Sequence, residues 1–105
     1  MKNIKFFYII ASNKMEARSI AKKLLLKKLI ACANIVSNVN SYFLWKNKVK
    51  STKEIIIFGK TTLKNQKKII QTVKKVHSYS VPCIIFFNIR SGNKNFLQWI
   101  KHSTI

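Results

Sequence analysis

Acidic residues, cysteines, glycines and prolines are all scarce in this sequence. Its 105 residues include two Asp or Glu, two Cys, two Gly and one Pro. Glu16 is expected in a helix cap and Glu54 in mid-strand, so the chain lacks the paired carboxylates of acid–base catalysis. Gly59 and Gly92 stand alone, which excludes a glycine-rich phosphate loop. We therefore expect a protein without enzymatic activity.

Neither the cysteines nor the apolar segments indicate a secreted or membrane protein. Cys32 and Cys83 are too few for a disulfide framework, which favours a reducing compartment. The longest apolar run, Phe6 to Ala11, is far shorter than the roughly 18 residues of a membrane span. We expect one cytoplasmic domain over residues 1–105 with no membrane partner.

Positive charge is the most unusual feature that is present. Lys and Arg number 21, and the formal net charge is +19. One explanation is a polyanionic partner such as nucleic acid. The other is mutational drift in an A/T-rich genome, since Lys, Ile and Asn have A/T-rich codons. Only Arg18 and Arg90 are arginines, and this scarcity favours drift because the arginine fork fits phosphate better than lysine does.

Hydrophobic patterns predict a strand, a helix and a long hairpin in the first half of the chain. Ile4 to Ile10 is predicted as a central strand. Asn13 and Glu16 match a capping box, with Asn13 as N-cap and Glu16 reaching back, and an amphipathic helix should follow to about Leu29. The hairpin is predicted from two β-rich runs and the polar turn between them, namely Ala31–Trp45, Val49–Lys60 and Lys46–Lys48.

The second half predicts a helix, a strand and a final helix. Thr61 or Thr62 could cap the first of these helices, which must end before Pro82 because the residue preceding a proline is pushed out of the helical region. Cys83 to Arg90 is predicted as a buried strand, and a short C-terminal helix follows Gly92. The order βαββαβ predicts an α+β, ferredoxin-like sandwich with an extended β-hairpin and a short C-terminal helix.

RNA-recognition domains share this order of elements, but their aromatic pattern is missing here. Their third strand carries aromatic residues on which bases stack. The corresponding segment, Glu54 to Lys60, does not fit that pattern. We expect no specific nucleic-acid partner, and weak nonspecific binding through charge alone stays as one hypothesis.

Five segments occur in the order and spacing of one known family and cover nearly the whole chain. They are Lys28–Ile35, Ser41–Trp45, Glu54 with Lys60 and Thr61, His77–Pro82, and Phe96–Ile100. Together they resemble the CutA divalent-ion tolerance proteins. The resemblance implies a cytoplasmic homotrimer, built by pairing the long hairpins of neighbouring subunits, with a role in tolerance of copper and other divalent metal ions.

The resemblance also implies a copper site, from which this sequence departs. In the family, copper is ascribed to a cysteine late in the first strand and to adjacent histidines before a Tyr-x-x-Pro loop. The corresponding residues here are Ile9, Val76 and His77, and only His77 is a metal-ligand type. Cys83, a short loop beyond His77, could supply a substitute thiolate. Copper is therefore an expected cofactor only by resemblance, with His77 and Cys83 as candidate ligands.

Trp45, Lys60 and Tyr79 are candidates for an interface or cleft between subunits. Family trimers resemble PII-type signalling proteins, which suggests an alternative function. In this alternative the chain is a non-enzymatic trimer that binds a small molecule or anion in lysine-lined clefts between subunits.

Overall fold

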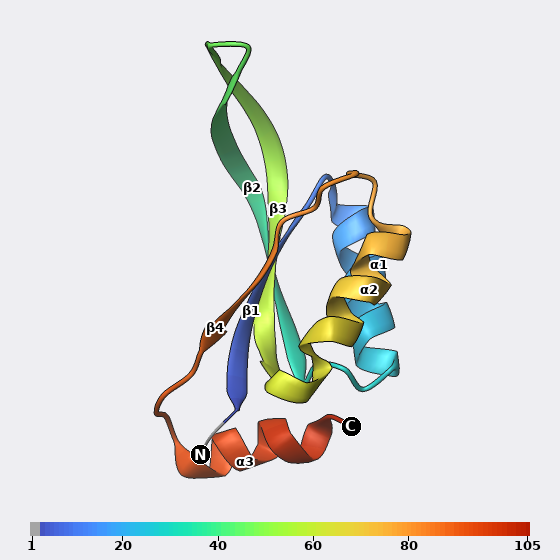
Figure 1. Ribbon diagram of the computed structural model, residues 1–105, viewed down its shortest axis with the longest axis vertical. Helices are drawn as coiled ribbons and strands as arrows, with labels where there is room; N and C mark the ends of the chain where they lie inside the picture. The colour runs from blue at the N-terminus through green and yellow to red at the C-terminus, as the bar shows by residue number, and fades with distance from the viewer. Residues whose placement is uncertain (1–2) are drawn as a thin grey trace.

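The structure, a computed structural model, describes residues 3–105 and contains a four-stranded antiparallel sheet with strand order β2-β3-β1-β4 (Figure 1). This arrangement confirms the predicted ferredoxin-like α+β fold. The elements in chain order are β1 (Ile4–Ala11), α1 (Lys14–Leu26), β2 (Cys32–Trp45), β3 (Lys48–Thr62), the 3-10 turn η1 (Leu63–Asn65), α2 (Gln66–Val76), β4 (Ile84–Asn88) and α3 (Lys94–Ser103). No helix in this part of the chain is long and apolar enough to cross a membrane.

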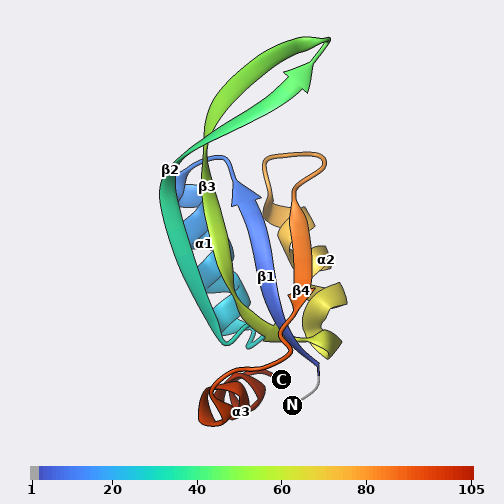
Figure 2. The same ribbon diagram turned by 90° about the vertical axis from the view of Figure 1, so that its left-hand side faces the viewer.

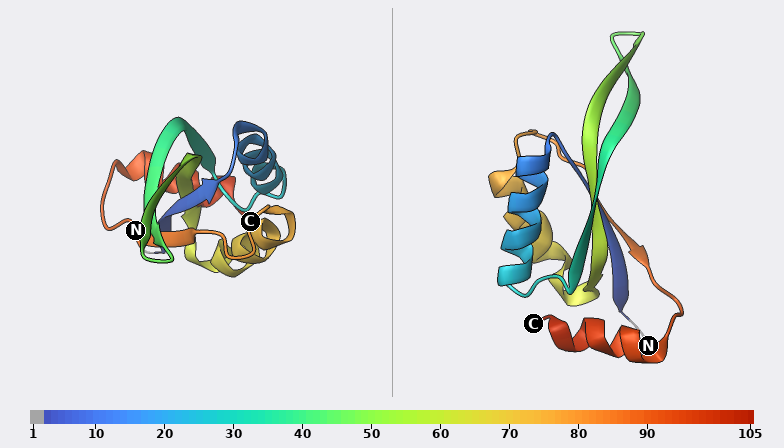
Figure 3. Two further views of the ribbon diagram at one scale, coloured as in Figure 1. Left: turned by 90° about the horizontal axis from the view of Figure 1, so that it is seen from above. Right: turned by 180° about the vertical axis from the view of Figure 1, so that it is seen from behind.

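Strand β1 lies at the centre of the sheet, between β3 and β4. Its alternate residues Phe7, Ile9 and Ala11 are fully buried. Helices α1 and α2 lie together on that face, as Figure 3 shows, and the opposite face is left open to the viewer in Figure 2. Buried Ile57 on β3 and Val73 on α2 join the same core. Each large side chain of this kind stabilises the fold by about 1.5–3 kcal/mol.

Helix α1 ends three residues earlier than predicted. The prediction placed its end near Leu29, but Lys28 adopts a left-handed conformation with φ of 57°. The Lys28 amide donates to Leu25 O and the Leu29 amide to Leu24 O, at 2.9 and 3.0 Å. This pattern is a Schellman turn, which satisfies carbonyls at the helix end. It reverses the chain and lets Leu29 enter the core instead of extending the helix.

Thr61 does not cap the second helix. It lies in β3 and is fully buried, where its Oγ1 donates to Leu29 O at 2.6 Å. Thr62 occupies the N-cap position before η1, but its side chain makes no cap hydrogen bond. The predicted side-chain cap is therefore wrong for both threonines, because the Thr61 hydroxyl donates to the loop after α1 and the Thr62 hydroxyl accepts from the Asn65 side chain at 3.0 Å.

The last strand is shorter and more exposed than predicted. A buried strand was expected from Cys83 to Arg90, whereas β4 covers Ile84–Asn88 at the edge of the sheet. Ile85 and Phe87 are exposed on the open face. The apolar run is consistent with a strand buried on both faces, but within residues 3–105 no element covers its second face.

Strands β2 and β3 form a hairpin that projects well beyond the helices (Figure 1). Lys46 and Asn47 connect them with φ values of 52° and 63°, the conformation of a two-residue type I′ turn. A register shift interrupts the pairing between Val36 and Val39, and Asn38 within it has φ of 60°. Such a bulge increases local twist, and it lies where the hairpin leaves the body of the sheet.

Candidate functional site

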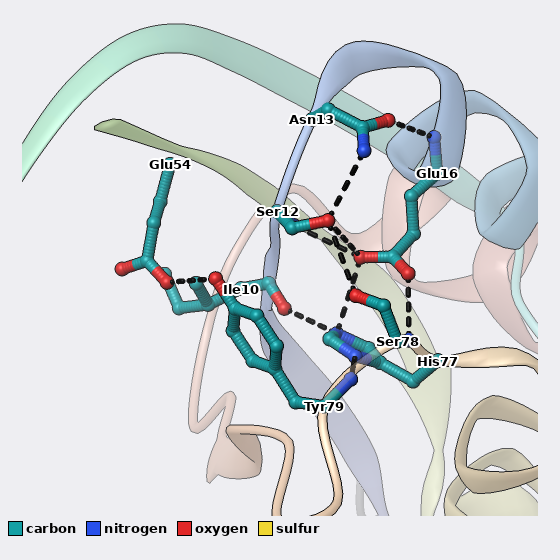
Figure 4. A network of polar contacts seen from close by, with 8 residues as sticks. All are labelled: Ile10, Ser12, Asn13, Glu16, Glu54, His77, Ser78 and Tyr79. Atoms are coloured by element: carbon teal, nitrogen blue, oxygen red, sulfur yellow. Dashed lines mark hydrogen bonds and ion pairs between the residues drawn. The ribbon is translucent and has the colours of Figure 1, made fainter. Parts of the chain in front are cut away.

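The loop that follows α2, residues 77–79, takes part in a network of polar contacts. It packs against the end of β1, the start of α1 and the middle of β3 (Figure 4). Both acidic residues of the sequence contact it, Glu16 from α1 and Glu54 from β3. In a chain with 21 basic residues, the two available carboxylates are thus used on one loop.

Glu16 joins three segments of chain. Asn13 caps α1 as predicted, since its Oδ1 accepts the Glu16 amide at 2.8 Å. The Glu16 carboxylate does not return to Asn13; it accepts the Ser12 amide and hydroxyl at 2.9 Å each and the Ser78 amide at 2.7 Å. Burial alone would raise the pKa of Glu16, but these hydrogen bonds outweigh it and lower the pKa to about 2. Glu16 is therefore an anion that fastens the loop to the start of α1.

His77 is locked in one tautomer by the backbone. Its Nδ1 accepts the Tyr79 amide at 3.0 Å, so Nε2 carries the proton and donates to Ile10 O at 2.7 Å. The side chain has no exposed surface, and Glu16 Oε1 is 3.8 Å from Nε2. Both ring nitrogens of His77 are thus engaged with the protein. Its role in this chain is to hold the loop against β1.

Tyr79 connects the loop to β3. Its hydroxyl donates to Glu54 Oε2 at 2.6 Å, and its ring lies 4.9 Å from the His77 ring. Burial, the hydrogen bond to Glu54 and the charges of both glutamates raise the pKa of Tyr79 to about 12. Tyr79 therefore remains a neutral donor at physiological pH.

Cys83 lies just before β4, and its carbonyl accepts the Ile10 amide at 3.3 Å. Ile10 is thus held by His77 through its carbonyl and by Cys83 through its amide. The thiol is free and half-buried, and burial together with the charge of Glu54 raises the pKa of Cys83. A raised pKa disfavours the thiolate, which is the form that binds metals.

The other two candidate residues lie far from this loop and from each other. Trp45 is exposed at the hairpin turn, where it pairs with Lys48. Lys60 is half-buried near the opposite end of β3, with its Nζ 6.0 Å from the Phe96 ring. The strand between Lys48 and Lys60 spans about 40 Å at the usual rise per residue. One copy of the chain therefore cannot bring Trp45 and Lys60 into one cleft, and their place between subunits stays a prediction.

Sequence reasoning missed the partners that make this network. Ser12, Ser78 and the Ile10 carbonyl take part in six of its nine hydrogen bonds. The serines had a detectable signal, because Ser12 stands directly before a predicted N-cap. The Ile10 carbonyl had none, since only the fold brings it to His77.

Comparison with known proteins relates the whole chain to one family. The family model of the CutA1 divalent ion tolerance proteins matches residues 5–103. The chain belongs to the CutA1 divalent ion tolerance family. The divalent-cation tolerance protein CutA of Archaeoglobus fulgidus is 42% identical over 95 residues, 90% of this chain and 92% of that protein. The protein of the same name from Thermus thermophilus is 38% identical over 88 residues, 84% and 85% of the two chains.

Solved CutA1 structures share the fold. The divalent ion tolerance protein CutA1 from Ehrlichia chaffeensis is 34% identical, with a TM-score of 0.93, and the match covers 100% of this chain and 98% of that one. CutA1 from Oryza sativa is 32% identical, with a TM-score of 0.95 and coverage of 99% and 95%. These likenesses confirm the family resemblance that the sequence motifs indicated.

The copper site implied by the resemblance does not fit this CutA1 chain. Ile9 is an apolar residue buried in the core beneath the helices, and the Val76 side chain has no atom that can bind a metal ion. His77 has both nitrogens engaged, as described above. Within residues 3–105, no group of three His, Cys, Asp or Glu side chains is close enough to hold a metal ion. Residues 3–105 of one chain therefore do not bring together the several N or S ligands that copper prefers.

Proposed function

We propose that this CutA1 protein acts in divalent-cation tolerance as a non-enzymatic homotrimer, and that it does so without a copper centre at His77. The observation that supports assembly most directly is the uncovered apolar face of its sheet. The exposed hairpin supports the same assembly, and the hydrogen bonds of both His77 ring nitrogens support the absence of a copper centre.

The open face of the sheet carries a cluster of aromatic rings. The Phe6 ring lies between those of Phe58 and Phe87, at centroid distances of 5.5 and 5.9 Å. Phe87 is 49% exposed, and its neighbour Ile85 is exposed on the same edge strand. Contiguous apolar surface of this kind marks an interaction site in soluble proteins. Further copies of the chain would bury it, because identical faces can meet around a symmetry axis.

The far half of the hairpin supports the same assembly. Leu44 and Val49 are cross-strand partners that are 71% and 70% exposed, and Tyr42 and Trp45 are exposed beside them. An isolated two-stranded ribbon is marginally stable in water, and its edges carry free hydrogen-bonding groups. Pairing with the hairpin of a neighbouring subunit would satisfy those groups and bury the apolar side chains.

The residues of the candidate site support a role in which the protein catalyses no reaction. Both carboxylates and His77 are used to fasten one loop. Both cysteines are free, which agrees with our proposal of a cytoplasmic protein. Tolerance would then depend on the assembled scaffold and not on a reaction.

Sedimentation equilibrium tests the assembly. We expect a mass of three chains, each of 12.2 kDa, at micromolar concentration. A monomer under these conditions would contradict the proposal, since the aromatic face and the hairpin would then both remain in water.

Titration with Cu(I) and Cu(II) tests the separation of tolerance from copper binding at His77. We expect no high-affinity stoichiometric binding in the unaltered protein, and the same result for His77→Ala, Cys83→Ala and the control His102→Ala. Tight binding that is lost in His77→Ala but kept in His102→Ala would overturn this part of the proposal. Unfolding curves of the three variants distinguish loss of a ligand from loss of the fold.

A further inference from the structure

Basic side chains gather on the solvent side of α1 and α2. We call this surface the helical face, and it includes all exposed basic residues on or beside the two helices. They are Lys14, Arg18, Lys22, Lys23, Lys27, Lys28, Lys64, Lys67, Lys68, Lys74 and Lys75. Lys14, Arg18 and Lys22 follow one another at i, i+4 spacing, so they form one ridge along α1. The helical face is therefore a broad surface of one charge sign.

Acidic residues do not compensate this charge. Glu16 is the only carboxylate on these helices, and its oxygens accept hydrogen bonds from Ser12 and Ser78. Glu54 lies on β3 and accepts from Tyr79. Within residues 3–105 neither glutamate forms an ion pair with a lysine or arginine. One carboxylate among eleven basic side chains leaves the helical face strongly positive, and solvent and counterions provide most of the screening.

The helical face is also on the far side of the molecule from the aromatic cluster. Helices α1 and α2 cover one face of the sheet (Figures 2 and 3). Phe6 alternates with buried Phe7 and Ile9 on β1, so Phe6 and its neighbours Phe58 and Phe87 lie on the other face. A partner of the helical face would therefore not compete with the assembly proposed above.

We propose that the helical face is a docking surface for the phosphate backbone of nucleic acid, bound without regard to base sequence. Ten of its eleven basic residues are lysines, which provide point charges that can neutralise phosphates, and only Arg18 has the planar fork that suits the reading of guanine edges. Helices α1 and α2 and the turn η1 contain no Trp, Tyr or Phe, the residues that anchor proteins at lipid surfaces. Charge complementarity without aromatic anchors favours a phosphate polymer over a membrane.

The test compares two variants that remove equal charge from different surfaces. In the first, Lys22, Lys67 and Lys74 on the helical face are replaced by Gln. In the second, Arg90, Lys94 and Lys101, all exposed near or on α3, are replaced by Gln. Binding to a fluorescent mixed-sequence DNA duplex is measured by anisotropy over a series of salt concentrations. A third variant with Arg at the three helical positions retains the charge.

We expect the unaltered protein to bind the duplex with a steep salt dependence. Each lysine that contacts a phosphate contributes about 0.9 to the slope of log affinity against log salt. The helical variant should therefore lose roughly two to three units of slope and at least tenfold in affinity at about 0.1 M salt. The α3 variant should lose less than about threefold, and the Arg variant should bind like the unaltered protein.

Three results would overturn the proposal. The first is the absence of salt-dependent binding to the duplex. The second is an equal loss in both Gln variants, because net charge alone would then explain binding, as lysine enrichment by mutational drift predicts. The third is tighter binding to vesicles of phosphatidylserine and phosphatidylcholine than to the duplex, which would assign the face to a membrane surface.

Discussion

The two halves of the β2–β3 hairpin share one strand pairing but differ in their relation to solvent. In the half nearer the helices, Ile55, Ile57 and Thr61 of β3 are buried at alternate positions. In the distal half, residues 48–53 are all exposed. The change occurs at Glu54, which accepts the Tyr79 hydroxyl and is paired with Val39 just beyond the bulge.

The apolar residues of the two halves therefore have different roles, one in folding and the other in the proposed assembly. Those of the buried half contribute to folding of the single chain, because they leave water when the helices pack on the sheet. Those of the distal half gain almost nothing in the single chain, since they remain in water. The assembly proposed above would remove them from water. Substitutions in the two halves should therefore affect different equilibria.

The largest expected effect is that of Gly59→Ala in the buried half. A Cβ at this position would lie 2.0 Å from Cys32 O and 2.9 Å from the Phe7 ring, so β2 or β1 would have to move. We expect a loss of about 3 kcal/mol or more in the free energy of unfolding, measured by urea denaturation. The matched control is Gly92→Ala, whose Cβ would meet Leu97 at an ordinary 3.5 Å and should cost less than about 1 kcal/mol. If Gly59→Ala lowers the free energy of unfolding no more than Gly92→Ala does, then β2 and β3 can separate at little cost in free energy.

The next effect concerns the distal half and the proposed trimer. Replacing Leu44 and Val49 by Ser should leave the fold of the single chain intact but weaken assembly, because both side chains are exposed in one subunit. Burial of one such side chain is worth about 2 kcal/mol, which corresponds to roughly 30-fold in the association constant. Sedimentation equilibrium measures this change. Met15→Ser with Leu26→Ser, which removes similarly exposed side chains from α1, should leave the mass unchanged.

The sequence predicted the elements better than it predicted their ends and surroundings. Periodicity located the hairpin and α1, because amphipathic spacing reflects which side faces the core. It placed the end of α1 wrongly, since a Schellman turn normally has Gly where this chain has Lys28. Thr61 was misread as a cap because only the folded chain brings Leu29 O within its reach.

The candidate site shows the same limit. His77 was identified from a family motif, which gave its position but not its contacts. Its engagement by Ile10 and Tyr79 depends on the approach of β1 to the loop after α2, and no local pattern encodes that approach. Residue type therefore indicated a ligand, whereas the hydrogen bonds assign His77 to the support of the loop.

Thr61→Val tests the buried half with a smaller change. The substitution keeps the shape of the side chain but removes the hydroxyl that donates to Leu29 O at 2.6 Å. We expect a loss of about 1–2 kcal/mol in the free energy of unfolding, because a buried carbonyl would lose its donor. Thr52→Val makes the same chemical change in the distal half, where the side chain is exposed, and should be nearly neutral. A larger loss of unfolding free energy in Thr52→Val than in Thr61→Val would contradict the contrast between the two halves.

The smallest expected effect is a pH dependence carried by Glu16, near the boundary of the two halves. Its folded-state pKa is about 2, below the ordinary value of 4.5, so the carboxylate stabilises the folded chain above pH 4.5. This contribution should be lost as the pH falls from 4.5 towards 2. Because solvent reaches part of this hydrogen-bond network and screens it, we expect only roughly 1 kcal/mol. Thermal unfolding across this range should show the loss in the unaltered protein and in Glu54→Gln. In Glu16→Gln the stability should be lower near neutral pH and nearly level through the same acid range, whereas an unchanged acid slope would mean that another group fastens the loop.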